Sequence, residues 1–165
     1  MSQTTRRGAL GRGLLFLGGF IGLGAAKATA APDQRALVLY ARNVDDHVGR
    51  QRPGGLPHRG DRLTLRAELL DRPDGDPIGE LHGAGFALHG PGAHAEDAER
   101  LELHTFRLRD GTIVGSGTSG SLDGEFAILG GTGRYAGVRG TYVARHSRRE
   151  LGGDGTAEFR LMLTA

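Results

Sequence analysis

Hydrophobic and polar residues alternate over several short stretches of this chain, a period typical of β-strands that bury one side. In residues 155–164, Ala157, Phe159, Leu161 and Leu163 share one side of an extended chain, and mainly polar residues occupy the other. No segment after residue 30 keeps a helical period, and residues 93–100 allow one or two helical turns at most. We predict eight strands, at residues 36–42, 62–70, 78–89, 99–109, 112–122, 125–130, 138–147 and 155–164.

Turn-forming residues separate the predicted strands, and Asp110-Gly111 and Asp123-Gly124 are typical of two-residue hairpin turns. Eight short antiparallel strands can form either a sandwich or a closed up-and-down barrel. Glycines inside strands, such as Gly83, Gly115 and Gly140, favour the barrel, because a small barrel needs the sharp coiling that glycine tolerates. We therefore predict an all-β, eight-stranded antiparallel up-and-down barrel, whose interior has room for side chains or one small ligand.

The first thirty residues have the pattern of an export signal. Arg6 and Arg7 precede an apolar run over residues 14–26, and Ala28-Thr29-Ala30 forms a cleavage site of small residues. The alternative is a membrane anchor, but this run is shorter than the roughly 20 residues that span a bilayer. We predict that residues 1–30 are a cleaved, twin-arginine-like signal peptide, and that residues 31–165 are exported to the periplasm or beyond without a membrane span.

Composition narrows the function of the predicted domain. The 165 residues suffice for one domain, and the absence of cysteine excludes disulfides, thiolate nucleophiles and cysteine-bound metals. Four of the 21 basic residues and none of the 19 acidic ones lie in residues 1–30, so the remainder has 17 basic and 19 acidic groups. Such a near-neutral domain is not expected to bind nucleic acid. Lys27 is the only lysine, so cleavage would leave none for Schiff-base chemistry.

One glycine motif has the spacing of a dinucleotide-binding loop but the wrong context. Residues 131–136 (GTGRYA) match G-x-G-x-x-G/A, which acts at the start of a helix in a parallel sheet. Gly137 and Gly140 would interrupt such a helix, and the next residues alternate as a strand. We therefore predict a tight turn between the sixth and seventh strands and no bound nucleotide.

Other catalytic motifs are missing from the sequence. The seven histidines form neither HExxH nor His-x-His, and no serine lies in GxSxG. Asp45-Asp46 and Glu96-Asp97 have the pattern of solvated loop acids rather than a catalytic pair. We expect no metal and no organic cofactor.

Several stretches, in this order and spacing, resemble the allene oxide cyclase-like and dirigent-like barrels. They are residues 60–63 (GDRL), 67–71 (AELLD), 76–79 (DPIG), 108–113 (LRDGTI) and, most specific, 126–140 (FAILGGTGRYAGVRG). The resemblance covers essentially all of residues 31–165. It implies a calycin-like barrel, often a dimer or trimer, that binds a hydrophobic reactive molecule without a cofactor and controls how it cyclises or couples.

The resemblance leaves two functions open. The first is a cyclase or isomerase of natural-product biosynthesis that directs stereoselective ring closure of a polyketide- or lipid-derived molecule, for example by intramolecular [4+2] cyclisation. The second is a non-catalytic dirigent-like or carrier protein that orients a small hydrophobic ligand outside the cytoplasm. The export signal favours the second and the polyketide-cyclising relatives favour the first, which we rank slightly higher. Both functions require a dry hollow inside the barrel.

Strand parity and the resemblance together select candidate site residues. The resemblance places the face that Tyr142, Ala144 and His146 share inside the barrel. By parity, His82 and Phe86 share a face in the third strand, as do Glu102, His104 and Phe106 in the fourth. Glu68, in the E-L-x-D run, is a candidate acid. Our predicted catalytic residues are Glu68, His104, Tyr142 and His146, and our predicted substrate-binding residues are His82, Phe86, Phe106 and Ala144.

Overall fold

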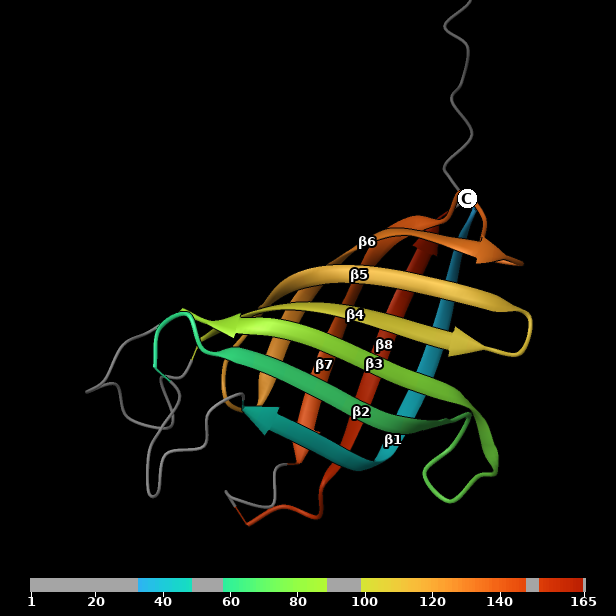
Figure 1. Ribbon diagram of the computed structural model, residues 1–165. Coiled ribbons are helices and arrows are strands. Elements are labelled where there is room, and N and C mark those ends of the chain that lie inside the picture. The colour runs from blue at the N-terminus through green and yellow to red at the C-terminus, as the bar shows by residue number, and fades with distance from the viewer. Residues whose placement is uncertain (1–32, 49–57, 89–98, 148–151, 165) are drawn as a thin grey trace, which may run out of the picture. The chain divides into compact units, whose positions relative to one another are not determined.

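Eight antiparallel strands form a closed barrel in the computed structural model, which describes residues 33–48, 58–88, 99–147 and 152–164 (Figure 1). Each strand pairs with its neighbours in sequence, and β8 pairs with β1 to close the barrel. The predicted all-β barrel is thus confirmed and the sandwich is wrong. The strands are β1 (Gln34–Val48), β2 (Arg62–Leu70), β3 (Pro77–Ala87), β4 (Arg100–Leu108), β5 (Gly111–Ser119), β6 (Asp123–Gly133), β7 (Arg139–Ser147) and β8 (Thr156–Thr164).

Some sequence predictions concern residues outside the described ranges. These are the signal peptide at residues 1–30, His89, His94 and the acidic pair Glu96-Asp97. Within the described ranges, the chain has no helix with the length and hydrophobicity needed to cross a membrane.

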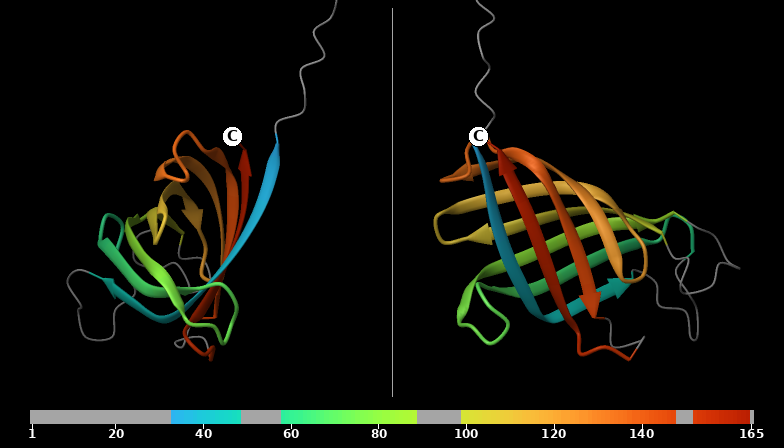
Figure 2. Two further views of the ribbon diagram at one scale, coloured as in Figure 1. Left: turned by 90° about the vertical axis from the view of Figure 1, so that its right-hand side faces the viewer. Right: turned by 180° about the vertical axis from the view of Figure 1, so that it is seen from behind.

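Strand β1 is longer than predicted because it bends and pairs with two different strands. Residues 34–41 pair with β8, and residues 40–48 pair with β2. The register shifts between Arg42 and Asp45, and Asn43 adopts a φ of 53°, a left-handed conformation that asparagine tolerates. The bend turns the chain from the steep strands β7 and β8 toward the flatter strands β2 to β5 (Figure 2). The polar residues that follow Arg42, among them Asp45 and Asp46, therefore continue the strand, where the sequence predicted a loop.

The hairpin turns lie close to their predicted positions. Strand β4 pairs with β5 up to Leu108 and Gly111, so Arg109 and Asp110 form the turn. At the next hairpin the amide of Gly120 donates to the carbonyl of Asp123, which places the turn just before the predicted Asp123-Gly124.

The glycine-rich motif forms the predicted turn between β6 and β7. Residues 134–137 lie in this turn, and the amide of Ala136 donates to the carbonyl of Gly133. Tyr135 and Val138 are buried against the barrel core. Because β7 pairs antiparallel with β6, residues 123–147 do not form the strand–helix–strand unit that a dinucleotide-binding loop requires.

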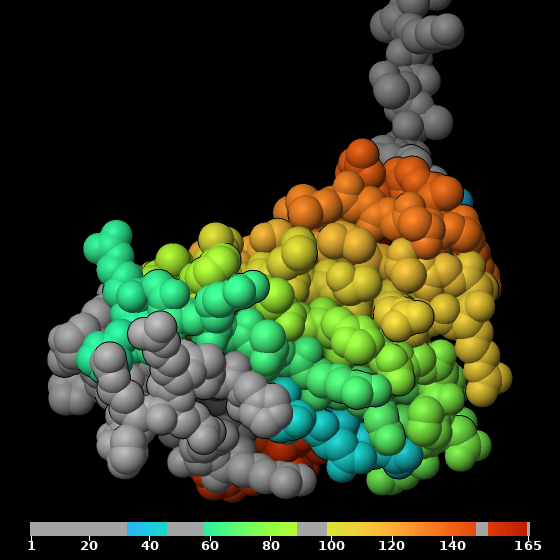
Figure 3. All heavy atoms as spheres, in the orientation of Figure 1, coloured from blue at the N-terminus to red at the C-terminus, as the bar shows by residue number. Residues whose placement is uncertain are grey.

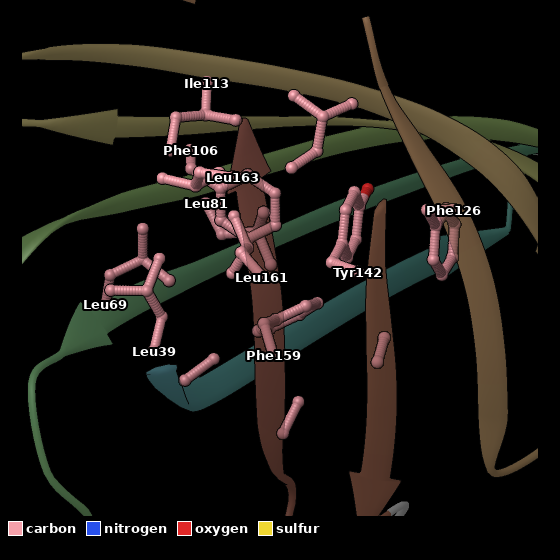
Figure 4. Packing of buried hydrophobic residues seen from close by; sticks show 14 of the residues in the cluster. Leu39, Leu69, Leu81, Phe106, Ile113, Phe126, Tyr142, Phe159, Leu161 and Leu163 are labelled. Atoms are coloured by element: carbon pink, nitrogen blue, oxygen red, sulfur yellow. The ribbon is translucent and has the colours of Figure 1, made fainter. Parts of the chain in front are cut away.

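Inward-facing side chains fill the barrel with a continuous hydrophobic core. Figure 4 shows Leu81, Phe106 and Leu161 in the middle of this packing. On the outside, the side chains over β3, β4 and β5 pack side by side and form a closed surface (Figure 3). Burial of this core is the main force that holds the strands together, since the chain has no disulfide.

Candidate functional site

Four polar side chains of the described residues contact one another inside the apolar barrel. Glu102 and His104 come from β4, Ser119 from β5 and Tyr142 from β7. Glu102 and His104 lie on the same side of β4 because they are two residues apart in a strand. Both are buried, so this side faces the inside of the barrel. His104 is fully buried and Tyr142 is 1% exposed. We call these four residues the polar cluster.

Hydrogen bonds and an ion pair connect the polar cluster. The Tyr142 hydroxyl lies 3.0 Å from Nδ1 of His104, and Nε2 of His104 lies 3.0 Å from Oε2 of Glu102. The Ser119 hydroxyl donates to Oε1 of Glu102 at 2.9 Å. With a neutral imidazole, the Nε2–H group lies toward the carboxylate and Nδ1 accepts a hydrogen bond from the Tyr142 hydroxyl. Buried networks of this kind, with strongly shifted pKa values, are typical of active sites.

The environment of the polar cluster fixes two of its charge states. Burial alone raises the pKa of Glu102, but the hydrogen bond and charge of His104, with the Ser119 hydrogen bond, outweigh it and lower this pKa to about 2. Burial and the nearby Glu102 charge raise the pKa of Tyr142 well above its usual range. At neutral pH Glu102 is therefore ionised and Tyr142 is protonated.

Aromatic rings and two glycines shape the space around the polar cluster. Tyr142 stacks on Phe126 with ring centroids 4.7 Å apart and an interplanar angle of 6°. A Cβ atom on Gly115 would lie 2.8 Å from the Tyr142 hydroxyl, and one on Gly83 would lie 3.2 Å from the His104 ring. These glycines leave the volume that the Tyr142 and His104 side chains occupy.

The structure places most of the predicted β4 and β7 site residues inside the barrel. His104, Phe106, Tyr142 and Ala144 are buried, and His146 is half-buried. His104 and Tyr142 contact each other directly, and Phe106 meets the Tyr142 ring edge-on at 5.3 Å. Their roles in binding or catalysis stay predictions.

Three predicted site residues lie on the outside of the barrel, which corrects their expected position. Glu68 pairs with Arg42 at 2.8 Å on the outer face of β2, between the buried Ala67 and Leu69. In β3, His82 contacts Glu80 at 3.1 Å, and Phe86 is 48% exposed. The inward positions of β3 are Leu81, Gly83, Gly85 and Ala87, because small residues fit where the neighbouring strands crowd the interior.

The expected ligand-sized hollow inside the barrel is also wrong for the described residues. A cavity of about 20 Å³ lies beside Glu102 and His104, enough for about one water molecule. We call it the small cavity. A larger hollow of about 420 Å³ lies where β1 bends, between the β2–β3 turn, the end of β7 and the start of β8. We call it the outer hollow. His146 lines both spaces.

The sequence did not select Glu102 and Ser119 as site residues. Parity placed Glu102 on the strand face of His104, but Glu102 was not among the selected site residues. Ser119 lies 17 positions away along the chain from Glu102 and meets it only through the pairing of β4 with β5. No sequence signal predicts that contact.

We expect the stabilising contribution of Glu102 to disappear in acid. Its pKa falls from an ordinary 4.5 to about 2 on folding, so the contribution is complete above pH 4.5 and is lost as the pH falls toward 2. The shift corresponds to about 3 kcal/mol. Urea unfolding of the parent and Glu102→Gln at several pH values would measure it. A stability difference that stays constant from pH 6 to pH 2 would contradict this assignment.

Tyr142→Phe should destabilise the barrel while preserving its ring packing. The variant keeps the stack on Phe126 but leaves Nδ1 of the buried His104 without its partner, which costs about 1–3 kcal/mol. Tyr40→Phe is the matched control, because Tyr40 is a half-buried tyrosine outside the polar cluster, and should change stability by less than about 0.5 kcal/mol. Equal urea midpoints for the two variants would show that the Tyr142 hydroxyl contributes nothing.

Comparisons with known proteins identify the class of fold. The sequence matches no family model and no curated protein. Solved structures do match: the pterocarpan synthase dirigent protein PsPTS1 has a TM-score of 0.63 and 19% identity, over 80% of this chain and 95% of that one. The Diels–Alderase AbmU from Streptomyces koyangensis has a TM-score of 0.57 and 20% identity, over 83% and 70%. Pyocyanin demethylase has a TM-score of 0.58 and 22% identity, over 80% and 100%.

These structures share the barrel rather than one reaction. The chain has the dirigent-type barrel fold, in agreement with the resemblance that its motifs show. A fold of this kind hosts several functions, so function has to be argued from the site.

Proposed function

We propose that the protein is a cyclase or isomerase that directs the ring closure of a small hydrophobic, reactive molecule. Side chains fill the interior hollow that the sequence led us to require for this function, so the molecule has to bind outside the packed core. The observation that carries this proposal is the buried chain of contacts from Glu102 through His104 to Tyr142. A polar network in a hydrophobic core costs desolvation energy, and apolar residues of similar volume are often as stable. A catalytic use of the network explains its presence better than stability does. Structural similarity to the Diels–Alderase AbmU supports the same reading.

The network can hold a proton close to a guest. Glu102 and His104 line the small cavity together with His146, which also lines the outer hollow, so they are the part of the polar cluster that lies toward a guest bound in that hollow. When His104 is neutral, its Nδ1 accepts a hydrogen bond from the Tyr142 hydroxyl. When it is protonated, its two N–H groups face Glu102 and the Tyr142 oxygen. Because His104 is fully buried, it acts on a guest through neighbouring groups rather than by direct contact: the network fixes the charge of Glu102, which shares the small cavity with His146.

Two matched carboxylate variants test the proposal. The purified protein is mixed, at substoichiometric amounts, with a linear polyene–dienophile or an allene oxide, and the stereoisomers formed are counted per protein molecule. We expect multiple turnovers of one stereoisomer, a loss of at least about 100-fold in Glu102→Gln, and little change in Glu68→Gln on the outer face. Turnover that survives Glu102→Gln unchanged would remove the polar cluster from the mechanism.

The second candidate function is a non-catalytic dirigent-like or carrier role. Structural similarity to a dirigent protein at a TM-score of 0.63 favours it. In this case the protein alone gives no turnover, and it shifts a product ratio only when an oxidase generates the radicals. Export through the signal-like residues 1–30 is a further part of the proposal and would place either activity outside the cytoplasm.

A further inference from the structure

Because side chains fill the barrel, the guest of the proposed enzyme needs a different place to bind. The small cavity holds about one water molecule, whereas the outer hollow, at about 420 Å³, falls within the roughly 300–1,000 Å³ of small-molecule sites. The inner wall of the outer hollow includes Ala41 and Ala157, which are also part of the hydrophobic core. Tyr40 and Pro73 add apolar surface. The outer hollow can therefore take an apolar body.

His146 connects the outer hollow to the polar cluster. Among the described residues it is the only one that lines both the outer hollow and the small cavity. Its ring meets Phe159 edge-on at 6.0 Å, and its backbone amide donates to the carbonyl of Leu122 at 2.7 Å. These contacts hold the imidazole at the boundary between the two spaces.

Charged groups surround His146 on both sides. Arg100, Glu102 and His104 line the small cavity with it. On the other side, the charged residues that line the outer hollow are Asp74, Arg145, Asp154 and Glu158. The charge of His146 is one of the influences that lower the pKa of Glu102, so the two groups interact.

We propose that the outer hollow binds the guest and that His146 exchanges a proton with it, while Glu102 stabilises the charged ring. The inference rests on the proposed function and names its substrate class: a small apolar molecule with one acidic O–H group, such as an enol or a phenol. In the step, the O–H bond of the guest breaks and an N–H bond forms on His146. The electron pair stays on the guest oxygen, and the proton returns after ring closure, so no oxidant or reductant takes part.

The experiment uses 4-nitrophenol, an apolar ring with one acidic hydroxyl, because its absorbance distinguishes phenol from phenolate. We expect the parent protein to bind it and to raise its phenolate fraction. Thr156→Trp places a large ring in the outer hollow and should raise the Kd about tenfold. Met162→Trp is the control on the same face of β8, about 20 Å along the strand, and should bind as the parent does.

A second pair of variants checks that the loss of binding does not come from a folding defect. A further variant, at His146, tests the proton transfer. Arg145→Trp, on the neighbouring strand, should repeat the loss, while Thr141→Trp should not. At saturating probe, His146→Gln should abolish the rise in phenolate. Equal affinity in both hollow variants and their controls, or no binding to the parent, overturns the assignment of the outer hollow. A phenolate fraction that persists in His146→Gln overturns the role of His146. Either result leaves the turnover test to decide the proposed function.

Discussion

Replacing Glu102, His104 and Tyr142 together by Met, Leu and Phe should leave the barrel folded but abolish turnover. A buried ion pair is often replaced by apolar residues of similar volume with no loss of stability. Removing all three takes away both partners of the Tyr142–His104 hydrogen bond and of the His104–Glu102 contact, so the Ser119 hydroxyl is the group of the polar cluster that loses its partner. We expect the free energy of unfolding to stay within about 2 kcal/mol of the parent. Turnover should fall by about 100-fold or more, because proton transfer is lost.

Unlike the triple variant, the single variant His104→Leu should lose much of its stability. It leaves the buried Glu102 carboxylate without its contact to Nε2 of His104, which should cost about 3–5 kcal/mol. Urea unfolding of the single and triple variants separates the two contributions, and the turnover assay is run on both. A triple variant that keeps parental turnover would show that the polar cluster only supports the fold. A triple variant less stable than the single one would mean that the cluster stabilises the barrel outright.

Gly115→Ala should displace Tyr142 and disrupt the polar cluster from the opposite strand. The added methyl group would clash with the Tyr142 ring, 2.8 Å from its hydroxyl, and would lie 2.9 Å from the carbonyl of Ala127. A buried ring between Phe126 and Phe106 has little room to move, so we expect a loss of about 1–3 kcal/mol in stability. Turnover should fall further than stability requires, because the hydrogen bond from Tyr142 to His104 depends on ring position.

Gly120→Ala is the matched control for this variant. A methyl group added at Gly120 would lie 3.7 Å from the carbonyl oxygen of Asp123, which is an ordinary contact distance. The free energy of unfolding should therefore change by less than about 0.5 kcal/mol. Adding Tyr142→Leu to Gly115→Ala should recover part of the lost stability, because the clashing ring atoms are gone, but no turnover. If Gly115→Ala proves as stable and active as the control, the tight fit between these residues is unimportant.

The sequence predicted the fold well because the barrel is built from local patterns. Alternation defines β4 and β8 almost to the residue, and the Asp-Gly pairs lie next to two of the hairpin turns. The extension of β1 beyond Arg42 was missed, because the residues around its bulge are polar and pair with β2 only after a change of register. Such a bend depends on the positions of two partner strands, which no local pattern contains.

The site was predictable only in part, for reasons of packing. Parity told us which residues share a face but not which face of each strand points inward. In β3 the inward positions carry Gly83 and Gly85, so the larger His82 and Phe86 suggested the wrong face. The filling of the interior by Phe106, Phe126 and Phe159 depends on side chains from three strands meeting at one point. The hollow that strand number alone predicted is therefore larger than the space that these side chains leave.

Because β1 closes the barrel against β8, the barrel cannot be completed before the last strand has formed. Leu39 pairs with Phe159, about 120 positions later, so the pairing that closes the barrel joins its first and last strands. Contacts this distant in sequence must overcome the entropy of a very long loop, and proteins rich in them fold slowly. The unsealed intermediate would present two unpaired strand edges, each able to recruit another chain. Until β8 pairs with β1, these two edges are where a second copy of the chain could add a strand.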